Sequence, residues 1–359
     1  MVDFDYPLDP KLIAQEPIEP RDSARLLVSI DAETPPAHRS IKDLPTLVRA
    51  GDVIVLNDTR VIPARLKLTR DTGGQVEVLL VDIVDPDMAP DEVGSAASAG
   101  DTQQWRALVR PSRKVAVGER LFAHPSLTIE IGDRVDGGQR LVRLLNPQTN
   151  EPYPPEREQD VLALIGQPPL PPYITTALAN AERYQTTFAR RPGSSAAPTA
   201  GLHLTPEVLT ACERAGAKIV RVELCVGLDT FRPVSVDRPE AHEIHSERFS
   251  VSEETLEICR HAKQNGGRVI AIGTTSVRAL ESAALATSNQ GRTKLFIYGD
   301  YSFQMVDVLL TNFHLPRSSL LLLVEAFVGP RWRDLYALAS TEQYRFLSFG
   351  DAMILGRRS

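Results

Sequence analysis

The chain contains 359 residues, of which 42% are hydrophobic and 24% charged, and its formal net charge is -6 at pH 7. This composition is typical of a globular protein with one large domain or two ordinary ones, and the negative charge argues against a protein that coats nucleic acid non-specifically. Three cysteines without a Cys-x-x-Cys pair suggest neither a disulfide framework nor a zinc knuckle, and they fit a reducing cytosol.

The beginning of the chain lacks the basic and apolar regions of a secretory signal. The longest purely apolar run, residues 320–324, is far shorter than the roughly 20 residues that a membrane span needs. We therefore expect a soluble, cytoplasmic protein with no membrane contact.

The first strand pattern covers residues 52–56, and Asn57, Asp58, Thr59 and Arg60 follow it. A carboxylate, a hydroxyl and a guanidinium thus stand at the end of a strand, where ligands bind in open α/β sheets. An internal salt bridge would explain the same residues without a ligand.

A different pattern begins at residue 61, where short β-branched runs are separated by Gly, Asp and Pro. The runs are at 76–84, 105–109, 127–131 and 141–145, and no helical period passes through them. They predict a small antiparallel β-barrel domain, residues 61–148, inserted into an α/β domain made of residues 1–60 and 149–359. The acidic segment 85–102 is expected to be the tip of a hairpin, and the proline-rich segment 152–172 a return linker.

The segment 193–205 is too polar and too rich in glycine for a core, and it predicts a close-approach binding loop. Gly201 lets a backbone come near a ligand, Thr199 after Pro198 offers a hydroxyl, and His203 is the only titratable group. The loop leads into a helix that Thr205 caps. An ordinary connection between a strand and a helix is an equal alternative.

Strands and helices alternate after residue 218, which predicts an α/β domain with a largely parallel sheet. The strands are expected at 219–224, 268–272, 295–298 and 308–313, and the helices from about 252, from about 275 and over 319–328.

Two histidines and three carboxylates lie between residues 240 and 247, including His242, His245 and Glu247. They suit proton transfer or metal ligation, but the spacing is not that of the His-Glu-x-x-His zinc helix. A metal-dependent hydrolase is therefore an alternative class, and a structural turn is another.

Gly273, Thr274 and Thr275 follow a buried strand and open a helix, the place where ligands bind in α/β sheets. The segment has neither the dinucleotide fingerprint nor a Walker lysine, so a neutral or zwitterionic ligand fits better. A second strand end carries Asn312, Phe313 and His314; here the amide could read a heteroaromatic edge, and the ring could stack or belong to the core.

Basic residues gather at 60–70, 106–114 and 183–191, near Tyr184 and Phe188. Such clusters can hold RNA phosphates, although a solvated surface is their commoner meaning.

Together these segments resemble the S-adenosylmethionine:tRNA ribosyltransferase-isomerase family of queuosine biosynthesis. The resemblance covers essentially the whole chain, and its blocks are residues 51–65, 169–174, 184–186, 196–203, 242–247, 273–278, 311–316 and 344–351. It implies an α/β domain with an inserted β-barrel and transfer of the ribosyl part of S-adenosylmethionine to an aminomethyl-7-deazaguanine at the tRNA wobble position. Adenine and methionine leave, and epoxyqueuosine is formed.

The resemblance also implies the partners: S-adenosylmethionine as co-substrate, a tRNA with a GUN anticodon, and no metal. We expect a monomer or weak dimer. The expected catalytic residues are His203, His242, His245, Glu247 and His314. The expected substrate-binding residues are Asp58, Thr59, Arg60, Pro198, Thr199, Gly201, Gly227, Gly273, Thr274, Thr275, Arg278, Asn312 and Phe313. We predict that the segments around Thr199, His203, His245, Thr275, Asn312 and His314 converge on one pocket.

One departure from the family pattern concerns residues 224–231, where a family histidine is Cys225 and a family glycine is Asp229. A thiol cannot replace an imidazole as a base near neutral pH unless its pKa is lowered. A divergent relative with an altered substrate or no catalysis is therefore a second hypothesis.

Overall fold

The computed structural model describes residues 1–84, 103–123, 125–135, 138–227, 234, 236, 238–242, 244 and 246–358. Contacts divide the chain into two compact units, one of residues 1–60, 170–191 and 196–359, the other of residues 61–169 and 192–195. The second unit therefore includes residues 149–169, which the sequence assigned to the α/β domain. No helix among the described residues is long and apolar enough to cross a membrane.

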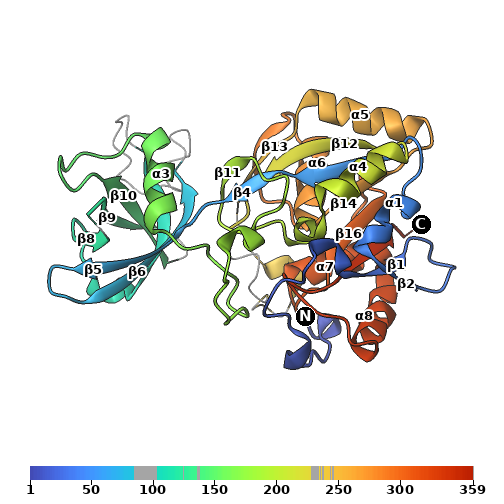
Figure 1. Ribbon diagram of the computed structural model, residues 1–359, viewed down its shortest axis with the longest axis horizontal. Coiled ribbons are helices and arrows are strands. Elements are labelled where there is room, and N and C mark those ends of the chain that lie inside the picture. The colour runs from blue at the N-terminus through green and yellow to red at the C-terminus, as the bar shows by residue number, and fades with distance from the viewer. Residues whose placement is uncertain are drawn as a thin grey trace. The chain divides into compact units, whose positions relative to one another are not determined.

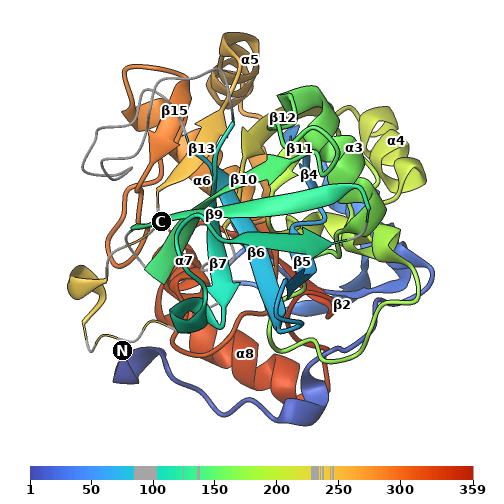
Figure 2. The same ribbon diagram turned by 90° about the vertical axis from the view of Figure 1, so that its left-hand side faces the viewer.

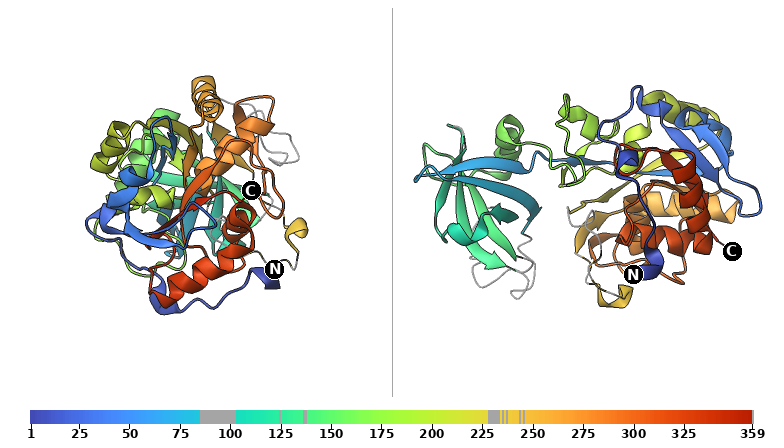
Figure 3. Two further views of the ribbon diagram at one scale, coloured as in Figure 1. Left: turned by 90° about the vertical axis from the view of Figure 1, so that its right-hand side faces the viewer. Right: turned by 90° about the horizontal axis from the view of Figure 1, so that it is seen from below.

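The first unit is built on a nine-stranded sheet, and both described chain ends belong to it (Figures 1 and 3). Its centre is parallel, because β12, β3, β14 and β16 pair in that order, whereas antiparallel pairs occur towards both edges. The strand order is β15 (Gln290–Thr293), β13 (Glu247–Ser250), β12 (Lys218–Leu224), β3 (Val53–Asn57), β14 (Val269–Ile272), β16 (Val308–Asn312), β17 (Ala352–Gly356), β1 (Arg25–Ser29) and β2 (Ala37–Ser40).

Helices cover both faces of this sheet, which is why its central strands are buried throughout. Alternate residues of β3 enter two different cores: Val53 and Val55 pack with α5, α6, α7 and α8, whereas Ile54 and Leu56 pack with α1 and α4. The helices are α1 (Leu44–Leu47), α4 (Pro206–Arg214), α5 (Glu253–Gln264), α6 (Thr274–Leu285), α7 (Ser319–Val328) and α8 (Trp332–Thr341).

Three of the predicted helix starts are confirmed by side-chain caps, whereas α6 begins after Gly273 without one. The hydroxyls of Thr205, Ser252 and Ser318 accept hydrogen bonds from the amides three residues ahead, at Val208, Thr255 and Leu321.

The strand predicted at 295–298 is wrong, because the edge strand is β15 and ends at Thr293. The following backbone bonds to side chains instead of a neighbouring strand. The amide of Leu295 donates to Thr293 Oγ1, and its carbonyl accepts from Arg278 Nε.

The second unit contains the predicted antiparallel barrel, which is closed (Figure 2). Its order is β10 (Gln139–Leu145), β7 (Trp105–Arg110), β6 (Gln75–Ile83), β5 (Arg65–Arg70), β8 (Arg120–Ala123) and β9 (Leu127–Val135). Two of these strands carry no β-branched run and were not predicted: in β5 basic side chains alternate with buried leucines, and β8 is only four residues long. The short strands β4 (Thr59–Val61) and β11 (Arg191–Ser194) form a separate ribbon. The hairpin tip expected at 85–102 lies outside the described residues.

The return linker predicted at 152–172 contains a helix, α3 (Pro155–Ile165). Pro154 and Pro155 stand where prolines are tolerated, at the cap and the first helical position, so they start the helix. Val161 and Leu162 are buried, and Glu158 accepts a hydrogen bond from Trp105 Nε1 of the barrel at 2.8 Å.

Candidate functional site

Two adjoining hollows lie at the carboxyl edge of the parallel strands in the first unit. The first, with about 320 Å³ of empty space, is lined by Tyr173, Thr199, Asn312, Phe313, His314, Leu315, Ser318, Leu320, Leu347 and Ser348. The second, with about 340 Å³, is lined by Ala197, Pro198, Thr199, Ala200, Val226, Gly273, Thr274, Thr275, Thr311, Asn312, His314 and Leu320. Because they share Thr199, Asn312, His314 and Leu320, we treat them as one candidate site with two halves.

Strand ends bring these residues together. Gly273 directly follows β14, and Asn312 is the last residue of the neighbouring strand β16. Gly273 has a φ of 86°, a conformation that favours glycine, and its amide donates to Leu310 O at 2.7 Å. This turn puts the beginning of α6 at the rim of the site, as expected for ligand sites of α/β sheets.

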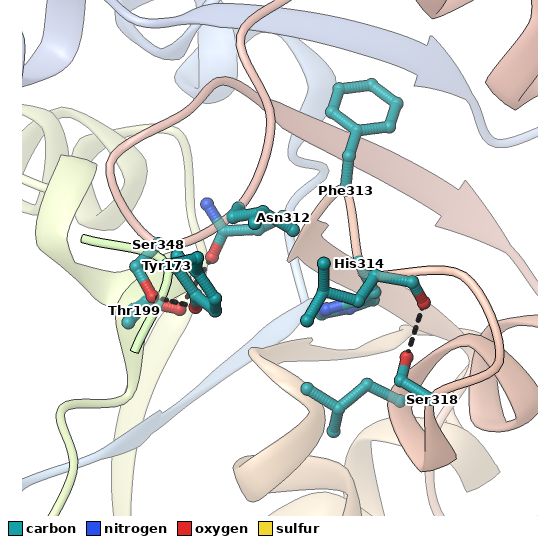
Figure 4. A pocket seen from close by; sticks show the side chains of 10 residues that line it. Tyr173, Thr199, Asn312, Phe313, His314, Ser318 and Ser348 are labelled. Atoms are coloured by element: carbon teal, nitrogen blue, oxygen red, sulfur yellow. Dashed lines mark hydrogen bonds between the residues drawn. The ribbon is translucent and has the colours of Figure 1, made fainter. Parts of the chain in front are cut away.

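Asn312 holds the 193–205 loop in place. Thr199 Oγ1 donates to Asn312 Oδ1 at 2.8 Å (Figure 4). Asn312 Nδ2 donates to the carbonyl of Asp351 at 3.3 Å. The amide that was expected to read a ligand edge therefore makes hydrogen bonds within the protein, and we infer that it positions Thr199.

His314 is the histidine that lines both halves of the site. Its side chain is 8% exposed, and its Nε2 lies 2.9 Å from Thr311 Oγ1. Burial lowers the pKa of His314 to about 3, so the imidazole is uncharged at neutral pH. The main-chain amide of His314 donates to Tyr336 OH at 3.0 Å, which fixes the backbone.

Phe313 belongs to the core. Figure 4 shows its ring directed away from Asn312 and His314, and it packs on Tyr336, Tyr344 and Phe346. The expectation that this ring could stack on a ligand is not supported by its position.

Tyr173 and Ser348 line the first half of the site and were not singled out from the sequence. Their hydroxyls lie 2.7 Å apart (Figure 4). Tyr173 lies in the block 169–174 that resembles the family. No local sequence pattern, however, connects this proline-rich segment with residue 348.

His203 does not join the other predicted site residues. Its Nε2 lies 2.7 Å from Gly350 O and its Nδ1 3.3 Å from Ala200 O, and burial lowers its pKa. It lines a separate hollow of about 210 Å³ with Arg21 and Arg183. Gly201 also serves packing, because a Cβ there would come within 2.8 Å of the Phe188 ring.

Glu247 and Arg278 form a buried ion pair outside the two hollows. Glu247 Oε1 also accepts from the amide of Gly227 at 3.3 Å. His242 packs edge-on against Phe296, with 5.4 Å between ring centroids, and His245 lies outside the described residues. Among the described residues, the predicted convergence thus holds for Thr199, Thr275, Asn312 and His314 and not for His203.

The strand end at residues 58–60 also lies outside both hollows. Asp58 is buried, and burial raises its pKa although Arg191 Nε is 4.0 Å from Oδ1. Thr59 is buried beside it, and Arg60 pairs with Glu182 at 2.6 Å. The alternative of an internal salt bridge holds for Arg60, with Glu182 as the partner.

Cys225 is buried beside β12 and β13. Its Sγ accepts from Arg248 Nη2 at 3.2 Å and lies 3.4 Å from Glu223 Oε1, and burial raises its pKa to about 12. It is therefore a neutral thiol that does not line either hollow, although its neighbour Val226 does. Asp229 lies outside the described residues.

We expect Cys225→Ser to change turnover by less than about threefold, because a group that moves no proton in the transition state contributes little to the rate. Steady-state kinetics of the purified variant, with the exposed-surface change Ser288→Ala as control, measure this. A loss of a hundredfold or more would mean that the thiol takes part in the reaction.

Comparison with known proteins identifies relatives over nearly the full chain. Residues 1–355 match the family model described as queuosine biosynthesis protein. The chain is 45% identical to S-adenosylmethionine:tRNA ribosyltransferase-isomerase of Thermus thermophilus over 98% of both chains. It is 44% identical to the protein of the same name from Acetivibrio thermocellus, again over 98% of both. It also resembles the crystal structure of S-adenosylmethionine tRNA ribosyltransferase from Thermotoga maritima, with a TM-score of 0.53, 32% identity, and 98% and 99% of the two chains covered.

Proposed function

Because the chain belongs to the queuosine biosynthesis family of S-adenosylmethionine:tRNA ribosyltransferase-isomerases, we propose that its reaction takes place in the two adjoining hollows. The enzyme transfers the ribosyl moiety of S-adenosylmethionine to tRNA and isomerises it, forming epoxyqueuosine. Adenine and methionine are released.

The position of His314 carries the assignment of the site. It is a buried, uncharged imidazole in the wall shared by both hollows. When Nε2–H is donated to the Thr311 hydroxyl, Nδ1 keeps its lone pair and can accept a proton.

The sulfonium of the substrate acidifies the 5′ protons of the ribose. We assign His314 Nδ1 to the removal of one of them, which breaks the C5′–H bond, leaves its electron pair on carbon next to the sulfonium and starts the rearrangement. Thr199, held by Asn312, supplies a hydroxyl beside the same atoms. Expulsion of adenine takes up the electron pair, and the amine of the tRNA base then forms a bond to the rearranged ribosyl group as the bond from carbon to the methionine sulfur breaks.

The test is an assay with S-adenosylmethionine and tRNA that carries the aminomethyl-7-deazaguanine. Chromatography should detect adenine and methionine in equal amounts, together with modified tRNA, and neither product when the tRNA is omitted. An absence of turnover with this tRNA would support the altered-substrate hypothesis.

We further propose that the enzyme acts in the cytoplasm, as a monomer or weak dimer, on tRNAs with a GUN anticodon. The identity of the family supports this choice of partner. Substrate tRNAs that carry the aminomethyl-7-deazaguanine in the first anticodon position and differ only in the second would measure the selectivity.

We also propose that the reaction needs no metal. Among the described residues no group of three or more His, Cys, Asp and Glu side chains could hold a metal ion, although His245 and Glu243 lie outside that part of the chain. Incubation with a chelator should leave turnover unchanged within about twofold, and elemental analysis should find no stoichiometric zinc. One zinc per chain, with activity lost on chelation, would favour the metal-dependent hydrolase instead.

A further inference from the structure

The two halves of the site differ in chemistry, and the ends of S-adenosylmethionine differ in the same way. One end of this molecule is a flat heteroaromatic adenine, and the other is an amino acid with a carboxylate. The orientation inferred here rests on the proposed function, since it assumes that the substrate binds in these hollows.

The second half of the site offers main-chain and hydroxyl hydrogen-bond donors, and no Lys or Arg of the described residues lines it. The first turn of α6, a twelve-residue helix, lines it through Thr274 and Thr275, and amides at a helix start lack partners within the helix. Among the described residues, no acidic side chain lines this half. A carboxylate is the part of the substrate that fits such a place.

One hydroxyl in this half points independently to a ligand. The Thr275 Oγ1 atom is buried and has no hydrogen-bond partner among the described residues, and Thr275 lines the hollow. A buried hydroxyl without a partner is unfavourable, so its place at the hollow indicates that a ligand supplies the missing bond.

The first half combines an aromatic ring and aliphatic side chains with uncharged polar groups. Tyr173, Leu315 and Leu347 line it, and in the part of the chain that the structure describes no Asp, Glu, Lys or Arg side chain does. The Tyr173 hydroxyl is held by Ser348 at 2.7 Å, which fixes the position of the ring (Figure 4). A ring in a fixed position beside aliphatic side chains suits a planar base.

We propose that S-adenosylmethionine lies across both halves, with its carboxylate at the first turn of α6 and its adenine beside Tyr173. The ribose and the sulfonium then lie at the shared wall of Thr199, Asn312, His314 and Leu320. This places the 5′ carbon near His314 without any further assumption.

Calorimetric binding of three ligands to the full chain tests this orientation. S-adenosylmethionine and S-adenosylhomocysteine carry both ends, whereas 5′-methylthioadenosine lacks the amino acid. Thr275→Val removes one hydroxyl at nearly constant volume, and Thr275→Ser keeps it. The Val variant should bind S-adenosylhomocysteine roughly tenfold more weakly and bind 5′-methylthioadenosine within twofold of the original protein, whereas the Ser variant should keep both affinities within about threefold.

A substitution at the proposed adenine end of the site tests the orientation independently. Tyr173→Leu should weaken all three ligands alike, because each contains adenine. The orientation is overturned if Thr275→Val weakens 5′-methylthioadenosine as much as S-adenosylhomocysteine, or if Tyr173→Leu leaves 5′-methylthioadenosine unaffected. If the unaltered protein binds none of the three ligands, the proposed function itself fails, which is a distinct outcome.

Discussion

Replacing His314 by Asn is expected to lower turnover by about 10²- to 10⁴-fold, the usual contribution of a group that transfers a proton in the transition state. The affinity for S-adenosylmethionine should change little, because the imidazole acts on the reacting carbon and adds little to ground-state binding. Single-turnover measurement of adenine release, together with calorimetric binding, separates the two effects.

The matched control is His261→Asn, since His261 is an exposed histidine on α5. It should leave turnover unchanged. If His314→Asn retains more than about a tenth of the original rate, another group removes the proton.

The lowered pKa of His314 also determines how this residue makes the reaction rate and the stability of the protein depend on pH. Because the pKa is about 3 in the folded protein and 6.5 when the residue is exposed, His314 stays neutral above pH 5 and should give the rate no acid limb between pH 5 and 9. The unfolded chain takes up the proton first, so this residue makes the protein less stable as the pH falls from 6.5 towards 3. His314→Asn should remove that part of the acid sensitivity.

Replacing Glu281 by Ala is expected to reduce the free energy of unfolding by roughly 3–5 kcal/mol, the largest loss of stability that we predict. Glu281 is fully buried on α6, and its carboxylate accepts from the amides of Gln304, Met305 and Val306 and from Tyr301 OH. Removing it leaves three main-chain donors without their acceptor.

Urea unfolding followed by circular dichroism measures this loss, with Glu257→Ala as control because Glu257 is an exposed glutamate on α5. The control should change the free energy by less than about 0.5 kcal/mol. A change below 1 kcal/mol for Glu281→Ala would show that water replaces the carboxylate and that the segment 304–306 rearranges at little cost.

The sequence predicted the elements whose signals are local. Thr205, Ser252 and Ser318 each precede a helix and cap it, because a hydroxyl reaches the amide three residues ahead whatever the rest of the fold does. The β-branched runs predicted strands for the same reason. The strand prediction at 295–298 failed because a side chain distant in sequence takes the place of a neighbouring strand. Arg278 bonds to the carbonyl of Leu295.

By itself the sequence determined the family, the α/β unit with an inserted barrel, and the strand ends that carry Thr275, Asn312 and His314. These follow from short patterns and from the rule that parallel strands end at one edge. Only the tertiary structure distinguished His314, which lines the site, from His203, whose ring nitrogens face the carbonyls of Gly350 and Ala200. It also paired Tyr173 with Ser348, because contacts between residues 175 positions apart depend on packing, and the sequence holds no local record of them.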